Sequence, residues 1–180
     1  DRMLNIIDDL VNIAQIQSGQ ARSKISEVRL DVFMKHLYDQ FESKAEKQNI
    51  EFHQLGIQEL KDRIIKTDQY KLDYAIRKLI SNGIKYTKKG SVTFCLKLEG
   101  DILSFDITDT GIGISPENQT KIFEQFVQVD NRPFKSEEGA GLGLAIANSF
   151  IEMLGGTVEL DSELGEGSTF YFQIPVEVLK

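Results

Sequence analysis

Two neighbouring stretches of alternating apolar and polar residues constrain the fold of this chain most. They cover residues 91–99 and 101–109, and Glu99-Gly100-Asp101 between them is typical of a tight turn. Strict alternation places apolar side chains on one face of each strand. The sequence therefore predicts a β-hairpin whose apolar face must be covered by another layer of the protein.

Other segments supply that layer. Apolar residues recur at helical spacing over 3–16, 31–48, 69–86 and 142–154, and a shorter helix is predicted over 116–126. Ser18-Gly19 is expected to end the first helix and Asp31 to be the N-cap of the second. Further strands are predicted over 25–31, 50–55, 62–67, 155–162 and 167–176. This order predicts an α+β fold: a two-layer α/β sandwich with helices on one face of a mixed, mostly antiparallel sheet.

Composition narrows the function classes. The chain of 180 residues is 41% hydrophobic and 27% charged, as in globular proteins, and its net charge of −7 argues against nucleic acid as a partner. No run of about 18 apolar residues and no signal peptide is present, so we expect this domain to be cytoplasmic. Membrane anchoring of its parent protein stays open. The single cysteine, Cys95, lies in the predicted hairpin and is expected in the core.

The motif DTGIGI follows the second hairpin strand. A carboxylate at the end of a buried strand, such as Asp109, can accept a hydrogen bond from a base, and the glycines Gly111 and Gly113 allow close approach of the backbone. Taken alone, the motif is more often a plain turn at the end of a strand. Its meaning therefore depends on the other motifs of the chain.

The motif GAGLGLAIA places Gly139, Gly141 and Gly143 directly before an apolar helix. The free N–H groups and the positive dipole at the start of such a helix form a phosphate site. The G-x-G-x-G spacing and the polar segment 128–139 before it exclude a Rossmann motif, and no P-loop sequence is present. We expect 128–139 to act as a lid over a bound nucleotide.

Four motifs in fixed order, KLISNGIKYT, DTGIGI, GAGLGLAIA and GEGSTF, resemble the N, G1, G2 and G3 boxes of the sensor histidine kinase ATP-binding domain, and IFEQFVQVD resembles its F box. The wider superfamily, called GHKL, includes Hsp90, DNA gyrase and MutL. The resemblance implies a Bergerat-type fold that binds ATP with Mg²⁺. It implies that Asn82 binds Mg²⁺ and that Asp109 accepts a hydrogen bond from adenine. Further nucleotide contacts are implied for Lys85, Tyr86, Gly111, Gly113, Gly139, Gly141, Leu142, Gly143 and, through water, Thr169.

The same resemblance implies the organisation of a larger protein. Residues 1–19 resemble the end of a dimerisation and phosphotransfer helix, and residues 20–180 resemble the catalytic domain. The partners expected are the chain's own dimerisation domain, a second copy in the full-length homodimer, and a response regulator receiver domain. His36 and His53 are expected to be ordinary surface or boundary residues. Neither lies in a phosphoacceptor motif, so this fragment is not expected to phosphorylate itself.

Two departures from the family pattern leave alternatives open. Lys78 stands where the N box has Asn, and Gln128 stands where relatives carry Arg, for which Arg132 or Lys135 is a possible substitute. A catalytically weak ATP-sensing module is therefore one alternative. A GHKL ATPase clamp is another, although the segment 71–82 offers Asp73 and no Glu to activate water.

Overall fold

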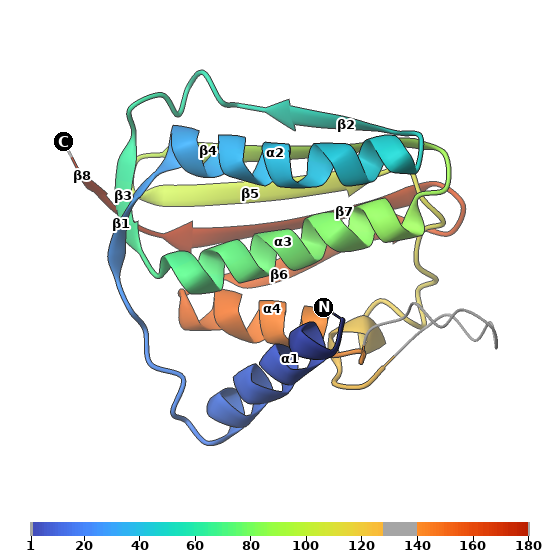
Figure 1. Ribbon diagram of the computed structural model, residues 1–180, viewed down its shortest axis with the longest axis horizontal. Coiled ribbons are helices and arrows are strands. Elements are labelled where there is room, and N and C mark those ends of the chain that lie inside the picture. The colour runs from blue at the N-terminus through green and yellow to red at the C-terminus, as the bar shows by residue number, and fades with distance from the viewer. Residues whose placement is uncertain (1, 128–139, 180) are drawn as a thin grey trace.

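The computed structural model describes residues 2–127 and 140–179. Figure 1 shows helices layered on a sheet. In chain order the elements are α1 (Arg2–Gln17), β1 (Ser26–Arg29), α2 (Leu30–Lys47), β2 (Ile50–Leu55), β3 (Ile64–Thr67), α3 (Gln69–Tyr86), β4 (Gly90–Glu99), β5 (Ile102–Asp109), the 3₁₀ turn η1 (Lys121–Phe123), α4 (Gly143–Met153), β6 (Thr157–Glu163), β7 (Gly167–Pro175) and β8 (Glu177–Leu179).

The main sheet has five strands in the order β2-β4-β5-β7-β6. Strand β2 runs parallel to β4, and the other pairs are antiparallel. The predicted hairpin is β4 and β5, joined through Gly100. A small antiparallel sheet, β1-β3-β8, forms separately at one end, and its last strand was not predicted. The α+β sandwich with a mixed, mostly antiparallel sheet is confirmed.

Helices α2, α3 and α4 lie against one face of the main sheet (Figure 1). Aromatic rings from three adjacent strands line this face: the centroids of Phe94 and Phe105 are 6.4 Å apart, and those of Phe105 and Phe172 are 5.4 Å apart. Leu72 and Ile76 of α3 are fully buried in the same core. Cys95 is buried, and His36 and His53 are exposed, as the sequence predicted.

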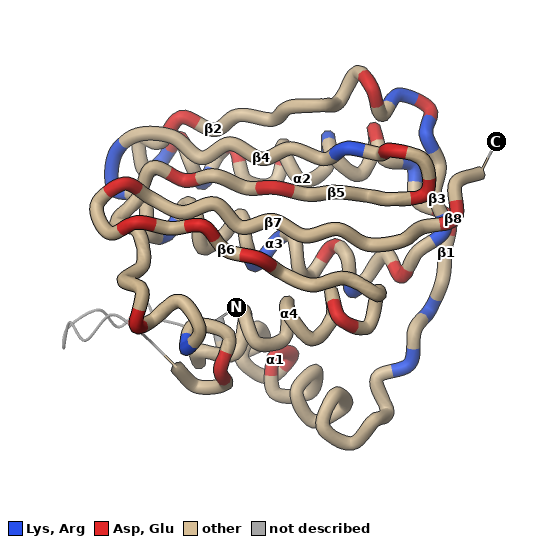
Figure 2. Tube along the Cα trace, turned by 180° about the vertical axis from the view of Figure 1, so that it is seen from behind, with Lys and Arg blue, Asp and Glu red and all other residues tan. Residues whose placement is uncertain are grey.

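The other face of the main sheet is seen from behind in Figure 2, where Asp and Glu follow β5 and β6. Side chains alternate along these strands, so Asp106, Glu159 and Asp161 lie on this face. The Tyr171 hydroxyl donates to Glu159 Oε2 over 2.6 Å there. This acidic surface repels anions, so a phosphate-bearing ligand belongs elsewhere on the molecule.

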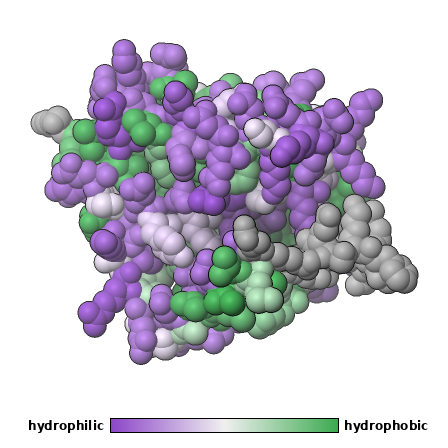
Figure 3. Space-filling view, in the orientation of Figure 1, coloured by the Kyte–Doolittle hydropathy of each residue, from purple (hydrophilic) through white to green (hydrophobic). Residues whose placement is uncertain are grey.

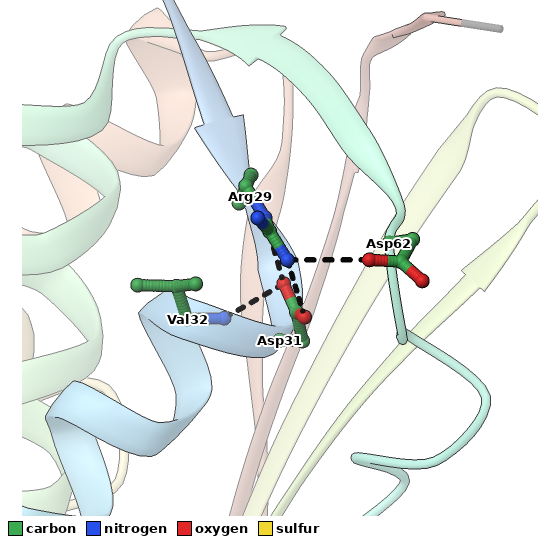
Figure 4. A network of polar contacts seen from close by, with 4 residues as sticks. All are labelled: Arg29, Asp31, Val32 and Asp62. Atoms are coloured by element: carbon green, nitrogen blue, oxygen red, sulfur yellow. Dashed lines mark hydrogen bonds and ion pairs between the residues drawn. The ribbon is translucent and has the colours of Figure 1, made fainter.

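The start of α2 differs from the prediction. The N-cap is Arg29, which forms no side-chain cap bond, and Asp31 lies in the first turn of the helix. Asp31 Oδ1 accepts from the Val32 N–H over 2.9 Å, while Arg29 Nη2 donates to Asp31 Oδ2 over 2.9 Å and to Asp62 Oδ1 over 3.3 Å (Figure 4). An acid in the first turn stabilises the positive end of the helix dipole without capping it.

The predicted helix over 116–126 is wrong. This segment forms turns, with a 3₁₀ turn at Lys121–Phe123. Gln119 Nε2 donates to the carbonyls of Ile114 and Ser162, which ties the segment to β6. Phe126 has φ of +64° and its N–H donates to the Gly141 carbonyl, so a helix cannot continue to that residue.

Helix α1 packs on the chain through one side. Ile13 is buried in a second apolar cluster with Leu142, Ile146 and Phe150. The opposite side exposes a patch, visible over α1 in Figure 3, that consists of Met3, Leu4, Ile7, Leu10 and Val11. Among the helices of the described residues, none combines the length and apolar character that crossing a membrane requires.

Candidate functional site

Asp109 is the last residue of β5 and pairs with Val92 of β4 and Ser168 of β7. Its side chain points toward the helices and is 7% exposed. The Gly111 N–H donates to Asp109 Oδ1 over 2.8 Å. Burial raises the pKa of the Asp109 carboxyl above its ordinary value, although the N–H groups of Gly111 and Ser168 oppose this. A carboxylate accepts several hydrogen bonds, so Asp109 retains acceptor capacity for a ligand.

The DTGIGI loop fits tightly between the end of α3 and the β6–β7 turn. A Cβ on Gly111 would lie 2.6 Å from both Asp109 Oδ1 and the Tyr86 carbonyl oxygen. The Ile112 N–H donates to that carbonyl over 3.3 Å, and the Ile112 carbonyl accepts from the Gly165 N–H over 2.8 Å. Gly113 has φ of +65°, and a Cβ there would overlap the backbone of Glu163. Only glycine fits at these two positions without moving the backbone.

The last turn of α3 carries Asn82, Lys85 and Tyr86. Lys85 Nζ donates to the Tyr86 hydroxyl over 3.1 Å and lies 4.8 Å from the ring centroid. From α2, Lys44 Nζ donates to Ser81 Oγ over 3.1 Å. Burial, together with the charge of Lys85, lowers the pKa of Lys44. Two ammonium groups therefore lie near this end of α3, whose carbonyl end favours cations.

The glycine-rich segment Gly141–Gly143 leads into α4. Gly141 has φ of +71°, and its Cβ position would meet the backbone of Phe126. Leu142 is the N-cap and forms no side-chain cap bond, so the first-turn N–H groups of α4 are not satisfied by that cap. The Leu142 side chain is fully buried beside Ile13 of α1, so this residue offers a ligand its backbone only. Gly139 lies outside the described residues.

Thr169 lies on the opposite face of the main sheet from Asp109. It pairs with Thr108, and its Oγ1 lies 3.0 Å from Thr108 Oγ1 on the outer face of the sheet. The adjacent Ser168 pairs with Asp109 and is 7% exposed, on the same face as that carboxylate. Because side chains alternate, a shift of one residue changes the face. Sequence reasoning missed Ser168, although the alternation Ser168, Phe170, Phe172 with Asp109 opposite would have indicated it.

Lys78 forms a contact with α1 that the sequence did not predict. Its ammonium donates to Asp9 of α1, over 3.0 Å to Oδ1 and 3.1 Å to Oδ2, and a Cβ on Gly143 would lie 3.1 Å from Lys78 Cδ. The Tyr74 hydroxyl donates to the same carboxylate over 2.6 Å. Burial first, and then the hydrogen bond to Asp9, raises the pKa of Tyr74. The other departure, Gln128, and its suggested substitutes Arg132 and Lys135 lie outside the described residues.

The four sequence motifs are linked pairwise by close approaches. A Cβ on Gly83 would lie 3.6 Å from Asp109 Cβ, which joins the first motif to the second, and a Cβ on Gly167 of the fourth motif would overlap the Asp109 carbonyl. The third motif approaches the first at Gly143, where an added Cβ would lie 3.1 Å from Lys78 Cδ. Grooves of about 610 and 410 Å³ lie elsewhere, beside Val176 and Ser149 respectively. Among the described residues, no three His, Cys, Asp or Glu side chains group as a metal site.

Comparison with known proteins assigns this arrangement to a family. The model of the histidine kinase-, DNA gyrase B- and HSP90-like ATPase family matches residues 67–178, and the chain belongs to this family. It is 33% identical over 183 residues to the autoinducer 2 sensor kinase/phosphatase LuxQ of Vibrio vulnificus, which covers 98% of the chain and 21% of LuxQ. It is 33% identical over 180 residues to the sensor histidine kinase WalK of Bacillus subtilis, covering 97% of the chain and 29% of WalK.

A solved structure extends the likeness to almost the whole chain. The crystal structure of full-length ShkA in complex with AMPPNP superposes with a TM-score of 0.82 at 26% identity, over 98% of this chain and 36% of ShkA. The fold is thus that of histidine kinase catalytic domains. The chain spans less than a third of the length of the curated relatives described above.

Proposed function

We propose that this chain is the ATP-binding catalytic domain of a two-component sensor histidine kinase. In this proposal residues 20–180 bind ATP with Mg²⁺, and residues 1–19 end a dimerisation and phosphotransfer helix. The observation that carries the proposal is the buried Asp109 carboxylate at the end of β5, which accepts from the Gly111 N–H and lies against Gly83 of the first motif. Membership of the ATPase family supports it.

Asp109 is the adenine acceptor in this proposal. Its carboxylate is buried at the end of β5, where the exocyclic amino group of adenine can donate to it in a partly dry setting. Gly111 and Gly113 keep the loop beside it free of side chains. Ser168 replaces Thr169 as the residue that shares this face, since Thr169 lies on the outer face.

The phosphates are bound at the start of α4. Backbone N–H groups after Gly139, Gly141, Leu142 and Gly143 and the helix dipole attract them. Lys85 and Tyr86 lie at the end of α3, where they reach the phosphates and the ribose. Asn82 supplies an amide oxygen to Mg²⁺, which takes its remaining ligands from water and phosphate.

The reaction places its nucleophile outside this chain. A neutral imidazole nitrogen of the acceptor histidine attacks the γ-phosphorus, a P–N bond forms, and the bond from phosphorus to the bridging oxygen breaks. The electron pair stays on ADP, and the imidazole proton passes to solvent. Residues of this chain hold and orient ATP for that attack, which is the main task of a protein in phosphoryl transfer.

The proposed partners follow from the same assignment. The exposed apolar patch of α1 fits the remaining helices of the dimerisation domain, and through them a second copy of the protein. A response regulator receiver domain then takes the phosphoryl group. The acidic sheet face speaks against nucleic acid as a partner. We assign this domain to the cytoplasm, whether or not its parent protein is anchored in a membrane.

Transfer to the acceptor domain tests the proposal. The upstream helical domain, purified separately, is incubated with this chain and ATP labelled at the γ-phosphate. Label on the upstream domain, lost with Asp109→Asn and retained with Asp106→Asn, is the expected result. Asp106→Asn is the matched control, because this substitution removes the same charge from the outer face of the same strand. Binding of ATP without transfer indicates a sensing module, and steady hydrolysis by the chain alone indicates an ATPase clamp.

A further inference from the structure

Lys78 connects α3 to α1 through a packed ionic contact. Its ammonium bonds both oxygens of Asp9, whose residue is 8% exposed, and lies 4.8 Å from the centroid of the Tyr74 ring. The Tyr74 hydroxyl donates to Asp9 as well. The Asp9 side chain is 11% exposed and the Lys78 side chain 28%, so the carboxylate is the buried partner, and removing Lys78 leaves its charge without compensation.

The same ammonium lies beside the phosphate site proposed above. A Cβ on Gly143, the first residue of α4, would lie 3.7 Å from Lys78 Nζ. Lys78 also precedes Asn82 by one helical turn, so both side chains share a face of α3. The cation that Asp9 holds is therefore next to the backbone N–H groups that attract an anion.

We propose that Lys78 is a further phosphate-binding residue, and that Asp9 of α1 competes with the nucleotide phosphates for its ammonium. This inference rests on the proposed function, because it takes the start of α4 as the phosphate site. A phosphate offers more charge and more acceptor oxygens than the carboxylate. When Lys78 turns to the phosphates, the buried Asp9 loses its cation, which weakens the docking of α1.

The competition couples two parts of the molecule in both directions. Docked α1 weakens phosphate binding, and bound phosphates weaken docking by the same factor. Other contacts keep α1 near the domain meanwhile: Asn12 Nδ2 donates to the Tyr70 hydroxyl over 3.0 Å, and Ile13 stays in the apolar cluster with Leu142. The Asp9 contact thus tunes the attachment of α1 without being its sole anchor.

The test compares two acidic residues that are adjacent on α1. Asp9→Asn removes the competing charge, whereas Asp8→Asn removes the same charge from an exposed position. Affinities for ATP and for adenosine, with Mg²⁺ present, are measured by calorimetry on the full chain. Asp9→Asn is expected to tighten ATP binding about threefold or more and to leave adenosine binding unchanged, and Asp8→Asn to change neither. Lys78→Met should weaken ATP binding about tenfold, again without affecting adenosine.

Equal ATP affinities of the Asp9→Asn and Asp8→Asn proteins, or equal changes for ATP and adenosine, overturn the inference. A wild-type chain that binds neither ligand overturns the proposed function instead, so the two failures are distinct. Hydrogen exchange of the unmodified chain gives a second readout that needs no variant. The amides of α1 should exchange faster with ATP than with adenosine, and identical exchange contradicts the competition.

Discussion

Lys71 Nζ donates to Asp68 Oδ2 over 2.6 Å, and the side chains are only 5% and 2% exposed. Asp68 also accepts from the N–H groups of Lys71 and Lys24, over 3.1 and 2.8 Å, and Lys71 Nζ donates to the Arg22 carbonyl over 2.8 Å. This buried pair therefore caps α3 and fixes the linker that follows α1.

Asp68→Ala is expected to lower the free energy of unfolding by about 3–5 kcal/mol, because Lys71 is then buried without its partner. Asp73→Ala is the matched control: Asp73 forms a more exposed pair with Arg77 at 3.3 Å, and its loss should cost less than about 1 kcal/mol. Urea unfolding measures both. Equal losses in the two variants contradict the structural role of the buried pair.

Acid should weaken the fold through the same carboxyl. Burial raises the pKa of Asp68, but the hydrogen bonds from Lys71 and Lys24 outweigh it, and the pKa is lowered from the ordinary value of 3.8. A lowered pKa contributes stability that is present above the unfolded value and is lost as the pH falls through the folded value. Unfolding measured between pH 7 and pH 2 should show this loss below about pH 4 in the wild type. The Asp68→Asn protein should lack that component, and an identical profile argues against it.

Asp109 should show the opposite relation to stability. Its raised pKa means that its contribution to stability is present below the unfolded value and is lost as the pH rises through the folded value. At pH 7 the buried charge therefore destabilises the ligand-free chain. We expect Asp109→Asn to keep or raise the unfolding temperature at pH 7 while it weakens ATP binding. A fall of the unfolding temperature indicates that the carboxylate is held for structural reasons.

Gly111 tests the geometry of the loop. Gly111→Ala places a Cβ 2.6 Å from Asp109 Oδ1 and from the Tyr86 carbonyl, so the loop must move and ATP affinity should fall about tenfold or more. Gly100→Ala is the control, because Gly100 also lies in a turn, with φ of +58° and no atom near its Cβ position. It should cost about 1 kcal/mol of stability and leave binding unchanged. Calorimetry of both variants decides, and unchanged affinity in Gly111→Ala contradicts the assignment of this loop.

Self-association should depend on the patch of α1. Leu4→Lys and Ile7→Lys place charges in the exposed apolar patch, at 62% and 47% exposure, without touching the catalytic core. If the isolated chain associates at high concentration, these variants should dissociate in sedimentation experiments. Persistence of the association in both variants would place the contact elsewhere.

The sequence predicted those elements in which the apolar periodicity extends over many residues. Helix α3 was expected over residues 69–86 and is observed there, because its buried apolar residues recur at helical spacing from Leu72 to Ile84. The three residues of β8 are too few to show alternation. The segment 116–126 had helical composition, but Gln119 and Phe126 are fixed by contacts with distant residues. Local patterns cannot report such contacts.

In the candidate site too, contacts within one motif were predicted and contacts between distant segments were not. Asp109 and Gly111 were predicted to act together and are joined by a hydrogen bond, since they are neighbours in one motif. The motif predicted Thr169 as a nucleotide contact, but Thr169 lies on the opposite face of the sheet from Asp109. Strand register decides which face a side chain occupies, and a motif does not report it. The contact of Lys78 with Asp9 joins residues 69 positions apart and depends on how α1 docks. No spacing within a motif indicates it.

The most direct test of the central claim is the dissociation constant of Mg²⁺-ATP, measured by calorimetry for the wild type, Asp109→Asn and Asp106→Asn. The account predicts that Asp109→Asn weakens binding about tenfold to a hundredfold, because a charge-assisted hydrogen bond to adenine is lost. Asp106→Asn, on the outer face of β5, should bind like the wild type. Equal affinity of all three proteins would contradict the assignment of this site to the adenine of ATP.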